Sequence, residues 1–258
     1  PPIRTKAGAL PGVRELPLRA EMPPVLVMND GSRVTTPKQW QRRRQEMRRI
    51  LEYYATGHAP PAPGNVKGRE LARETVSDGA VLYRLMRLTF GPGAKLSLNV
   101  GVFTPTRSGK FPAIIYFSGT PPGAEALPRQ PQGPSQGRGE NVLLLVGPGS
   151  ATSAPPRAMP PQPTAQALAT RHAEVFRRGY ALVTFNPNDC AEDTTLRNQD
   201  GSWAFRNTRF FPLYPESDWG ILAAWAWGAS RVADYLESDA SIDAKKLKIG
   251  RASCRERV

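Results

Sequence analysis

From residue 111 onward, short apolar runs alternate with segments of helical periodicity. Residues 111–117 and 180–185 are nearly continuous apolar runs, which are typical of strands buried on both faces. Apolar side chains recur at helical spacing in 164–178 and 217–237, and another apolar run begins at Leu247. This order predicts an α/β fold, with a mostly parallel sheet, right-handed crossovers and helices on both faces.

The helix 217–237 is expected to be central and buried, because apolar side chains cover much of its circumference. Ser217 is its expected N-cap residue, and Asp218 would complement the helix dipole from the first turn. An earlier helix is predicted to start at Thr36, since Thr36-Pro37-Lys38-Gln39 has the pattern of a capping box. Gly57 fits the left-handed residue that ends such a helix.

Residues 81–90 and 95–104 have the pattern of two strands joined by a Gly-Pro-Gly turn, which predicts an antiparallel hairpin at one edge of the sheet. Residues 1–35 have little periodicity and are expected to form an irregular N-terminal arm. The sheet and its helices then occupy 36–250 as one α/β domain. Within it, 119–163 holds 11 prolines and 7 glycines, so an irregular insert is expected there.

Basic residues exceed acidic ones by 13 over the 258 residues. The excess belongs to the N-terminal part, because residues 1–110 hold 19 basic and 8 acidic side chains. The helix 36–54 is rich in arginine and could neutralise phosphates, so a basic nucleic-acid-binding module is one alternative. The arginines are Arg42, Arg43, Arg44, Arg48 and Arg49. The same helix has an apolar stripe to bury and no known RNA or DNA motif accompanies it, which argues against nucleic acid as a partner.

Composition argues against several other classes of protein. No apolar run approaches the ~20 residues of a bilayer-spanning helix, so no membrane partner is expected. Cys190 and Cys254 are too few for a disulfide scaffold or a four-thiolate zinc site. His172 lies on an apolar helix stripe and His58 follows a helix stop, so packing and surface or capping roles are expected for them. Neither has a partner at ligand spacing, and we expect no metal and no cofactor.

The loop 186–215 holds two groups of side chains with competing interpretations. Asp189, Glu192 and Asp193 could bind a cation or fix the loop, although solvated loop charges are the commoner case. The aromatic residues could stack on sugar faces, although packing over the sheet is the commoner outcome. They are Trp203, Phe205, Phe210, Phe211 and Tyr214.

The strand that begins at Leu247 ends at Gly250, where an α/β sheet can open into the tight turn that presents a nucleophile. In the motif G-x-S-x-G, the serine stands two positions after the first glycine and small neighbours avoid clashes. Ala252 occupies that position here. Ser253 is one place late, so it is a candidate nucleophile only if the turn is slipped.

Several segments resemble the glucuronoyl esterases, a family of α/β-hydrolases related to acetyl xylan esterases. They are Tyr53–Pro61, Phe111–Gly119, Arg178–Thr184, Asp218–Gly220, Ala223–Gly228, Asp234–Glu237 and Ile242–Lys246. The tryptophan-rich helix is the most specific part of the resemblance. It covers roughly residues 25–250, departs in 120–163, and implies that 36–250 form an incomplete α/β-hydrolase domain.

In that family the strand-ending glycine is followed by His-Ser-Arg, in which serine is the nucleophile and arginine helps to stabilise the oxyanion. This chain has Arg251-Ala252-Ser253 instead. Residues 251–258 look like translated adapter sequence, and we expect them to be a non-native tail. The family's nucleophile, acid and histidine would then lie beyond this point, so none is carried over to a numbered residue and the fragment is expected to be inactive.

The resemblance implies that the parent is a serine carboxylic-ester hydrolase acting on plant cell-wall polysaccharide, at the glucuronoyl ester that joins xylan to lignin. An acetyl xylan esterase of the same fold is the alternative. In the general fold, one oxyanion donor comes from the loop after the strand ending at Phe117, which makes Gly119 and Thr120 candidates, with Ser118 beside them. The competing interpretation is that Gly119 only makes the turn. Family members are usually exported, so a secreted or periplasmic parent is expected.

Overall fold

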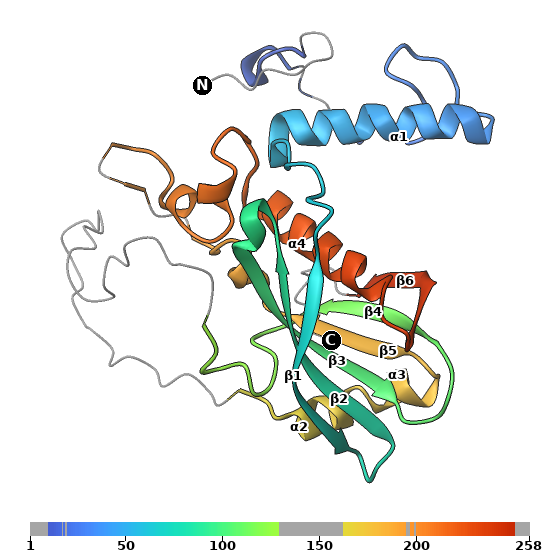
Figure 1. The fold of residues 1–258 in the computed structure, drawn as a ribbon. Coiled ribbons are helices and arrows are strands. Elements are labelled where there is room, and N and C mark those ends of the chain that lie inside the picture. Colours follow the sequence, from blue (N-terminus) through green and yellow to red (C-terminus); the bar gives the residue numbers. More distant parts are fainter. Residues whose placement is uncertain are drawn as a thin grey trace, which may run out of the picture. The chain divides into compact units, whose positions relative to one another are not determined.

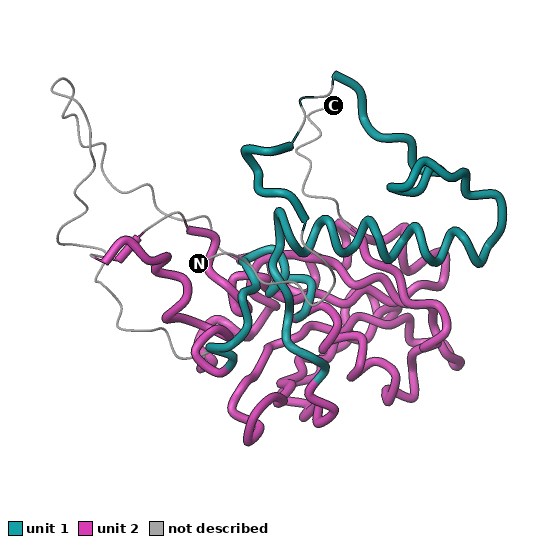
Figure 2. The backbone as a smooth tube through the Cα atoms, turned by 90° about the horizontal axis from the view of Figure 1, so that it is seen from above, with its two compact units in different colours: residues 1–62, 214–227 teal, residues 63–213, 228–258 magenta. Residues whose placement is uncertain are grey.

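The computed structural model describes residues 10–250 except 17, 19, 129–161, 195–196 and 199. The chain divides into two compact units, which have different colours in Figure 2. The first combines Pro1–Ala62 with Tyr214–Trp227, and the second combines Pro63–Leu213 with Gly228–Val258. Most of the predicted insert 119–163 and the whole of 251–258 lie outside the described residues.

The second unit contains a six-stranded sheet with the strand order β1-β2-β3-β5-β4-β6 (Figure 1). Its strands are β1 (Lys67–Val76), β2 (Val81–Phe90), β3 (Leu96–Pro105), β4 (Phe111–Phe117), β5 (Ala181–Phe185) and β6 (Ile242–Gly250). β4 pairs in parallel with both β5 and β6, as predicted. The pairs β1–β2, β2–β3 and β3–β5 are antiparallel. The sheet is therefore mixed, and the expectation of a mostly parallel sheet is wrong.

Strand β1 is the element that the hydrophobic pattern does not indicate. Its sequence, KGRELARETV, has no alternation of apolar and polar residues, and nearly all of it is exposed. β1 is an edge strand, where charged side chains protect the open edge against pairing with other chains. The predicted hairpin of β2 and β3 is confirmed, in a register that runs from Val81–Pro105 to Phe90–Leu96. Its predicted place at the edge of the sheet is wrong, because β1 pairs with β2 on the outer side.

Two further boundaries differ from the predicted ones. β6 begins at Ile242, five residues before Leu247, because Ile242 already pairs with Phe111 of β4. The register then shifts, and the pairing resumes at Leu247. The predicted helix 164–178 is two short helices, α2 (Ala165–Arg171) and α3 (Ala173–Arg177). They are separated at His172, where the backbone leaves helical geometry at φ −108° and ψ 22°.

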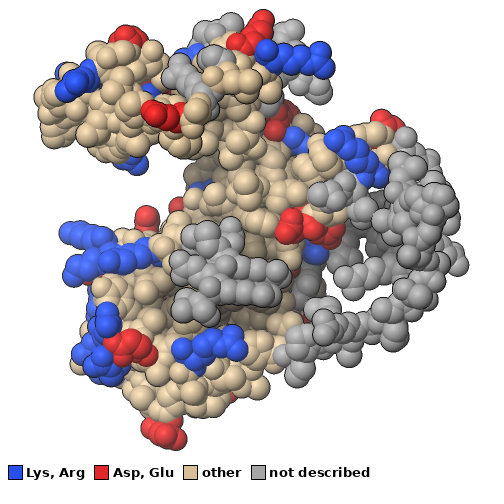
Figure 3. All heavy atoms as spheres, turned by 180° about the vertical axis from the view of Figure 1, so that it is seen from behind, with Lys and Arg blue, Asp and Glu red and all other residues tan. Residues whose placement is uncertain are grey.

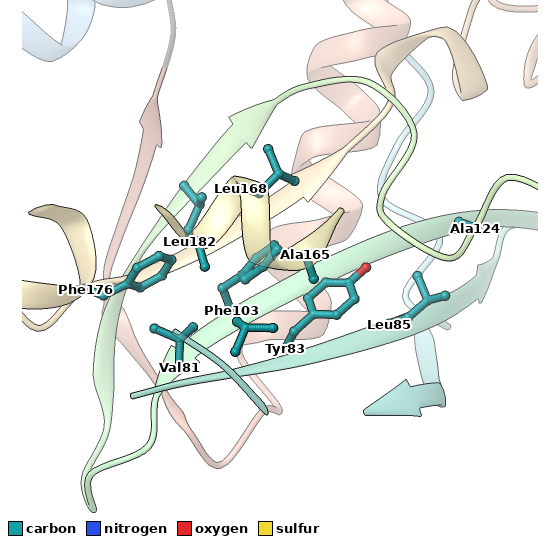
Figure 4. Close-up of a cluster of buried hydrophobic side chains, with 11 residues drawn as sticks. Val81, Tyr83, Leu85, Phe103, Ala124, Ala165, Leu168, Phe176 and Leu182 are labelled. Carbon is teal, nitrogen blue, oxygen red and sulfur yellow. The ribbon is translucent and has the colours of Figure 1, made fainter. Parts of the chain in front are cut away.

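One face of the sheet packs against α2 and α3. Tyr83 of β2 and Phe103 of β3 lie with ring centroids 4.5 Å apart, and the Phe176 ring of α3 lies 6.2 Å from Phe103. Leu182 of β5 and Leu168 of α2 belong to the same buried cluster (Figure 4). Because side chains alternate along a strand, the odd-numbered residues of β2 share this face.

The opposite face of the sheet carries the part of α4 (Ile221–Leu236) that belongs to the second unit. Leu82 and Arg84, of opposite parity to Tyr83, line a cavity together with Tyr235 of this helix. Gly68 of β1 lies directly under the Tyr235 ring, and a Cβ atom at Gly68 would overlap it. Helices therefore cover both faces, as predicted.

The first unit is organised around α1 (Pro37–Leu51). The capping box is confirmed: Thr36 Oγ1 accepts from the Gln39 amide at 3.2 Å, and Gln39 Oε1 accepts from the Thr36 amide at 3.0 Å. A π-helical turn, Glu52–Thr56, extends the helix. Gly57 ends it with φ 68°, so its predicted role as the stop is also confirmed.

Arg43 ties the N-terminal arm to α1. Its side chain is almost fully buried. Its Nε donates to the Val25 carbonyl at 3.2 Å, and its Nη1 donates to Asn29 Oδ1 at 2.8 Å and to Glu46 Oε2 at 2.9 Å. The Asn29 amide in turn donates to Glu46 Oε2 at 3.1 Å. One guanidinium and one carboxylate therefore fix two points of the arm.

Arg43→Ala is expected to release this arm. The variant loses three hydrogen bonds and leaves the Val25 carbonyl and the Asn29 amide oxygen without their donor, which costs about 2 kcal/mol. Urea unfolding measures that loss, and limited thermolysin digestion is expected to cut faster within 20–35. Arg44→Ala on the exposed side of the same helix is the matched control, with an effect of at most about 0.5 kcal/mol. Equal losses for both variants would contradict the tie.

A segment after α1 is fastened to the chain around the start of α4. The Gly220 amide donates to the Thr56 carbonyl at 2.7 Å, and the Trp227 indole N–H donates to the Pro60 carbonyl at 2.9 Å. The Trp219 and Trp227 rings lie 5.6 Å apart in a T-shaped arrangement, and both are buried. The two stretches of the first unit are thus held together by backbone contacts and by aromatic packing.

His58 and Asp218 form a further contact between these two stretches, and α4 begins later than predicted. The His58 amide donates to Asp218 Oδ1 at 2.6 Å, and His58 Nδ1 lies 3.1 and 3.2 Å from the two carboxylate oxygens. The Asp218 carboxylate is therefore engaged outside the helix. α4 begins at Ile221, so the predicted N-cap role of Ser217 is wrong. The helix is expected from its sequence to be buried, but the side chain of Leu222 in its first turn is 60% exposed.

Candidate functional site

The carboxyl ends of the three parallel strands meet at one edge of the sheet in the second unit, which we call the carboxyl edge. Phe117 at the end of β4 pairs with Phe185 at the end of β5, and Tyr116 pairs with Gly250 at the end of β6. In open α/β sheets, ligands bind beyond this edge. The loops that follow Phe117, Phe185 and Gly250 therefore define the candidate site.

The loop 118–124 after β4 is anchored at both ends. The Ser118 amide donates to the Phe185 carbonyl at 3.1 Å, which continues the strand pairing by one residue. The Tyr83 hydroxyl donates to the Pro122 carbonyl at 2.7 Å, and Ala124 is buried in the core. A loop fixed in this way holds its amide groups in place, which is what an oxyanion donor requires.

The two candidate oxyanion donors differ in their surroundings. Gly119 is exposed, and its amide donates no backbone hydrogen bond to any residue in the described part of the chain. Its φ is not positive, so the turn does not require glycine for backbone reasons. A Cβ atom at Gly119 would lie 3.1 Å from Gln162 Oε1. Thr120 is buried, and its Oγ1 accepts from Asn186 Nδ2 at 3.3 Å, so its hydroxyl has a structural contact.

Asn186 is a residue of this edge that no motif in the sequence indicates. Its Nδ2 bonds to Thr120, and its Oδ1 accepts from the Asn188 amide at 3.0 Å at the start of a 3-10 turn, Pro187–Asp189. Asn186 thus connects the loops that follow β4 and β5. The signal that could have found it is an asparagine placed directly after a buried strand and before proline, where its side chain can bond to its own turn.

The acidic residues of the next loop fix that loop. Asp189 is buried. Glu192 Oε1 lies 3.1 Å from Arg209 Nη2, and the Asp193 amide donates to Asn188 Oδ1 at 3.3 Å. For Asp189 and Glu192, these contacts favour loop fixing over cation binding, whereas the contact of Asp193 is made by its backbone amide.

Cys190 lies behind this loop as a packing residue. Burial raises the pKa of its thiol well above the usual value, with the Asp189 charge adding to the shift and Arg209 opposing it. A Cβ atom at Gly228 of α4 would overlap Cys190 Sγ, so the helix backbone and the sulfur pack closely. A buried thiol of this kind is protonated and unreactive at neutral pH.

At the end of β6, the requirement for a small residue is met. A Cβ atom at Gly250 would lie 2.6 Å from Ile114 Cγ2 of the neighbouring strand, so the pairing of β4 and β6 leaves no room for a side chain. Ala252, which occupies the position expected for the nucleophile, and the alternative candidate Ser253 lie outside the described residues. Of the three loops that define the candidate site, the structure therefore describes only those that follow β4 and β5.

The two histidines have structural surroundings. The His172 ring packs against Tyr116 in a T-shaped arrangement with centroids 5.2 Å apart, and burial, with the nearby Arg171 charge, lowers its pKa. This agrees with the packing role predicted for it. His58 belongs to the first unit, and within the described residues its ring bonds only to Asp218.

The aromatic loop packs inside the protein. Phe205, Phe210, Phe211 and Tyr214 are buried, and the Phe205 and Phe211 rings lie 4.9 Å apart. Trp203 is partly exposed. The Arg197 guanidinium covers its ring at 3.5 Å, and Phe205 stacks with it at 6.1 Å. Packing is the predicted outcome that these contacts support.

The arginines of α1 do not all face solvent. Arg43 is buried and bonded to the arm, and Arg48 Nε lies 2.7 Å from Glu52 Oε1. On the face drawn in Figure 3, lysine and arginine side chains (blue) form no continuous stripe, because acidic side chains (red) and uncharged surface interrupt them. These contacts weaken the nucleic-acid alternative, which needs free cations along a phosphate backbone.

Two kinds of feature are missing from the part of the chain that the structure describes. There, no group of three or more histidine, cysteine, aspartate or glutamate side chains is placed to hold a metal ion. Among the same residues, no helix combines the length and the apolar character that crossing a membrane requires.

Comparison with known proteins gives a consistent set of relatives. A family model described as fungal glucuronyl esterase matches residues 150–256. Carbohydrate esterase MZ0003, from an unknown prokaryotic organism, is 23% identical over 244 residues, which are 88% of this chain and 52% of that protein. A 4-O-methyl-glucuronoyl methylesterase from Schizophyllum commune is 24% identical over 234 residues, covering 90% of this chain and 43% of that protein.

Solved structures show the same relationship in the fold. A glucuronoyl esterase from Solibacter usitatus matches with a TM-score of 0.62 and 22% identity, over 92% of this chain and 58% of that one. The catalytic domain of a glucuronoyl esterase from Hypocrea jecorina matches with a TM-score of 0.52 and 23% identity, over 95% and 50%. The fold is therefore that of these α/β-hydrolases over part of their length. The chain spans about half the length of the curated relatives it matches.

Proposed function

We propose that this chain, which belongs to the glucuronoyl esterase family, is the N-terminal portion of a serine carboxylic-ester hydrolase that cleaves glucuronoyl esters of plant cell-wall polysaccharide. Relatives that carry out 4-O-methyl-glucuronoyl methylester chemistry match it over about 90% of its residues. That match is the observation that carries the proposal. The three parallel strands that end at the carboxyl edge agree with it, because the nucleophile of an α/β-hydrolase follows such a strand.

In the proposed reaction of the parent enzyme, a serine attacks the ester carbonyl, a histidine takes and returns the proton, and a carboxylate orients the histidine. The part played by the described residues is to hold the developing oxyanion. The Gly119 amide is the proposed donor, since it is exposed at the carboxyl edge and its loop is anchored through Ser118 and Pro122. One such donor typically contributes about 10²–10³-fold in rate.

We further propose that this chain has no hydrolytic activity by itself. Ala252 occupies the position where the family has its nucleophile, and a methyl group cannot attack an ester. No turnover of glucuronic acid methyl ester or p-nitrophenyl acetate above the uncatalysed rate is expected. The matched variant is Ser253→Ala. Turnover by the chain that this variant abolishes would overturn the proposal and assign the nucleophile to Ser253.

A chimaera tests the positive half of the proposal. Residues 10–250 are joined to the part of the Solibacter usitatus enzyme that follows the corresponding glycine, and folding is checked by circular dichroism. The folded chimaera is expected to hydrolyse glucuronic acid methyl ester. Gly119→Pro, which removes the amide donor, is expected to lower kcat by about 10²–10³-fold, whereas Gly119→Ala keeps the donor and most of the activity. A folded chimaera that cleaves only acetyl esters would favour the acetyl xylan esterase alternative.

A further inference from the structure

The second unit contains an open cavity of about 700 Å³ that the candidate site does not use. It lies at the amino end of β6, whereas the candidate site lies at the carboxyl end of the same strand. Residues of β1 and β2 line one side of it, and residues of the turn between α4 and β6 line the other. Its charged and hydroxyl-bearing lining includes Lys67, Arg73, Arg84, Ser238, Asp239 and Ser241.

Arg84 is held in this cavity by a buried carboxylate. Its Nη2 donates to Asp239 Oδ2 at 2.9 Å and to Ser241 Oγ at 3.0 Å. The Asp239 side chain is only 4% exposed and is satisfied by further donors. These are the Tyr235 hydroxyl at 2.9 Å and the Ser241 hydroxyl and amide at 2.6 and 3.0 Å. The direction of the guanidinium plane is therefore fixed before any ligand arrives.

The cavity retains donors for an anion. Within the described residues, Nη2 is the only Arg84 nitrogen with a hydrogen bond, so Nε and Nη1 are available. Lys67 has no ion pair in that part of the chain, and its side chain lines the same space. Arg73 is engaged by Glu70 through two bonds of 2.7 and 2.9 Å. The region thus contains three cationic side chains and two carboxylates. Both carboxylates, Glu70 and Asp239, are already bonded to an arginine.

We propose that this cavity binds the carboxylate of a uronic acid. A pre-oriented guanidinium whose Nε and Nη1 protons remain unbonded, beside a flexible ammonium, offers a carboxylate charge-assisted hydrogen bonds from two cations. The hydroxyl groups of Ser238 and Thr104 offer partners to sugar hydroxyls, and the volume is in the range of small-molecule sites. That the ligand is an anion follows from the cations of the cavity. The choice of a carboxylate, and of a sugar acid, rests on the proposed function, whose substrate polymer carries glucuronate.

Titration of the whole chain with glucuronate, followed by calorimetry and by NMR shifts, tests this site. Binding is expected to move the amide signals of 238–241, and methyl glucoside, which lacks the carboxylate, is expected not to bind. Lys67→Gln is expected to weaken glucuronate affinity about tenfold, because it removes one charge-assisted contact. Lys95→Gln is the matched control on the exposed β2–β3 turn and is expected to leave affinity unchanged.

A second variant tests the guanidinium. Arg84→Lys keeps a cation beside Asp239 but removes the Nε and Nη1 donors, and a loss of about tenfold is expected. Affinity unchanged in both Lys67→Gln and Arg84→Lys overturns the proposal, as does equal binding of methyl glucoside. Tighter binding of inorganic phosphate than of glucuronate also overturns it. Because binding requires no ester hydrolysis, glucuronate binding by a folded but inactive chimaera would separate failure of the proposed function from failure of this site.

Discussion

Replacing Gly57 by alanine is expected to destabilise the first unit by about 3–5 kcal/mol. Gly57 has φ 68° and ψ −177°, a backbone region that is essentially restricted to glycine. A Cβ atom there would also overlap the Asp218 carbonyl group and lie 2.7 Å from Trp219 Cα. These are backbone atoms, so no side-chain rotation can relieve the contact. The variant must therefore move the segment that carries His58 away from the start of α4.

Urea unfolding followed by tryptophan fluorescence measures this effect, because Trp219 and Trp227 are buried in the same unit. The matched control is Gly64→Ala. Gly64 has the same φ of 68°, but no heavy atom lies within 4 Å of its Cβ position. It reports the cost of a positive φ alone, at about 1–2 kcal/mol. Similar losses in the two variants would contradict a close contact between Gly57 and Asp218.

The sequence predicts those parts of the fold whose causes are local. The apolar runs that become β4 and β5 are visible because strands buried on both faces need no alternation. The start of α1 is visible because the capping box uses residues three positions apart. The parallel pairing of β4 with its two neighbours follows from the order of strands and helices along the chain.

The remaining elements depend on contacts between distant residues. The expected cap of α4 fails because Asp218 bonds to His58, which is 160 positions away. β1 and the first half of β6 are edge segments rich in charged side chains, so neither leaves an apolar signal in the sequence. Periodicity within a window of the sequence contains neither kind of information.

The candidate site shows the same division. The edge itself could be predicted, since the loops after β4 and β5 follow from the strand order, and Gly119 and Thr120 lie in the first of them. The contact between Asn186 and Thr120 could not, because it joins two loops that are 66 residues apart. The cavity at the other end of β6 could not be predicted either, since Arg84 and Asp239 are 155 positions apart.

Removing the Arg84 guanidinium is expected to destabilise the protein by about 3–5 kcal/mol at neutral pH, the usual result when one partner of a buried pair is lost. Arg84 and Asp239 have side chains that are 12% and 4% exposed. Burial acts to raise the pKa of Asp239, but hydrogen bonds from Ser241 and the Arg84 charge outweigh it and lower that pKa. In Arg84→Met the carboxylate stays buried and loses the Arg84 charge, which is one of the causes that lower its pKa, so its pKa is higher in the variant than in the native protein.

This difference gives the variant a characteristic pH dependence. In the native protein, the stabilisation from Asp239 is complete above the ordinary aspartate pKa of about 3.9 and is lost as the pH falls through the lowered folded value. In Arg84→Met the folded pKa is higher than in the native protein, so the carboxyl group of the variant becomes neutral at a higher pH, and the penalty of its buried charge is relieved there first. The gap between the two proteins is therefore expected to narrow from neutral pH to about pH 4.

Urea unfolding at the two pH values measures the gap, with Arg73→Met as the control. Arg73 forms a more exposed pair with Glu70, and its loss is expected to cost at most about 1 kcal/mol. A penalty for Arg84→Met that is equal at both pH values would mean that lost packing of the arginine stem causes the destabilisation. A penalty that shrinks with acid, together with a small effect of Arg73→Met, would instead assign it to the charge left on Asp239.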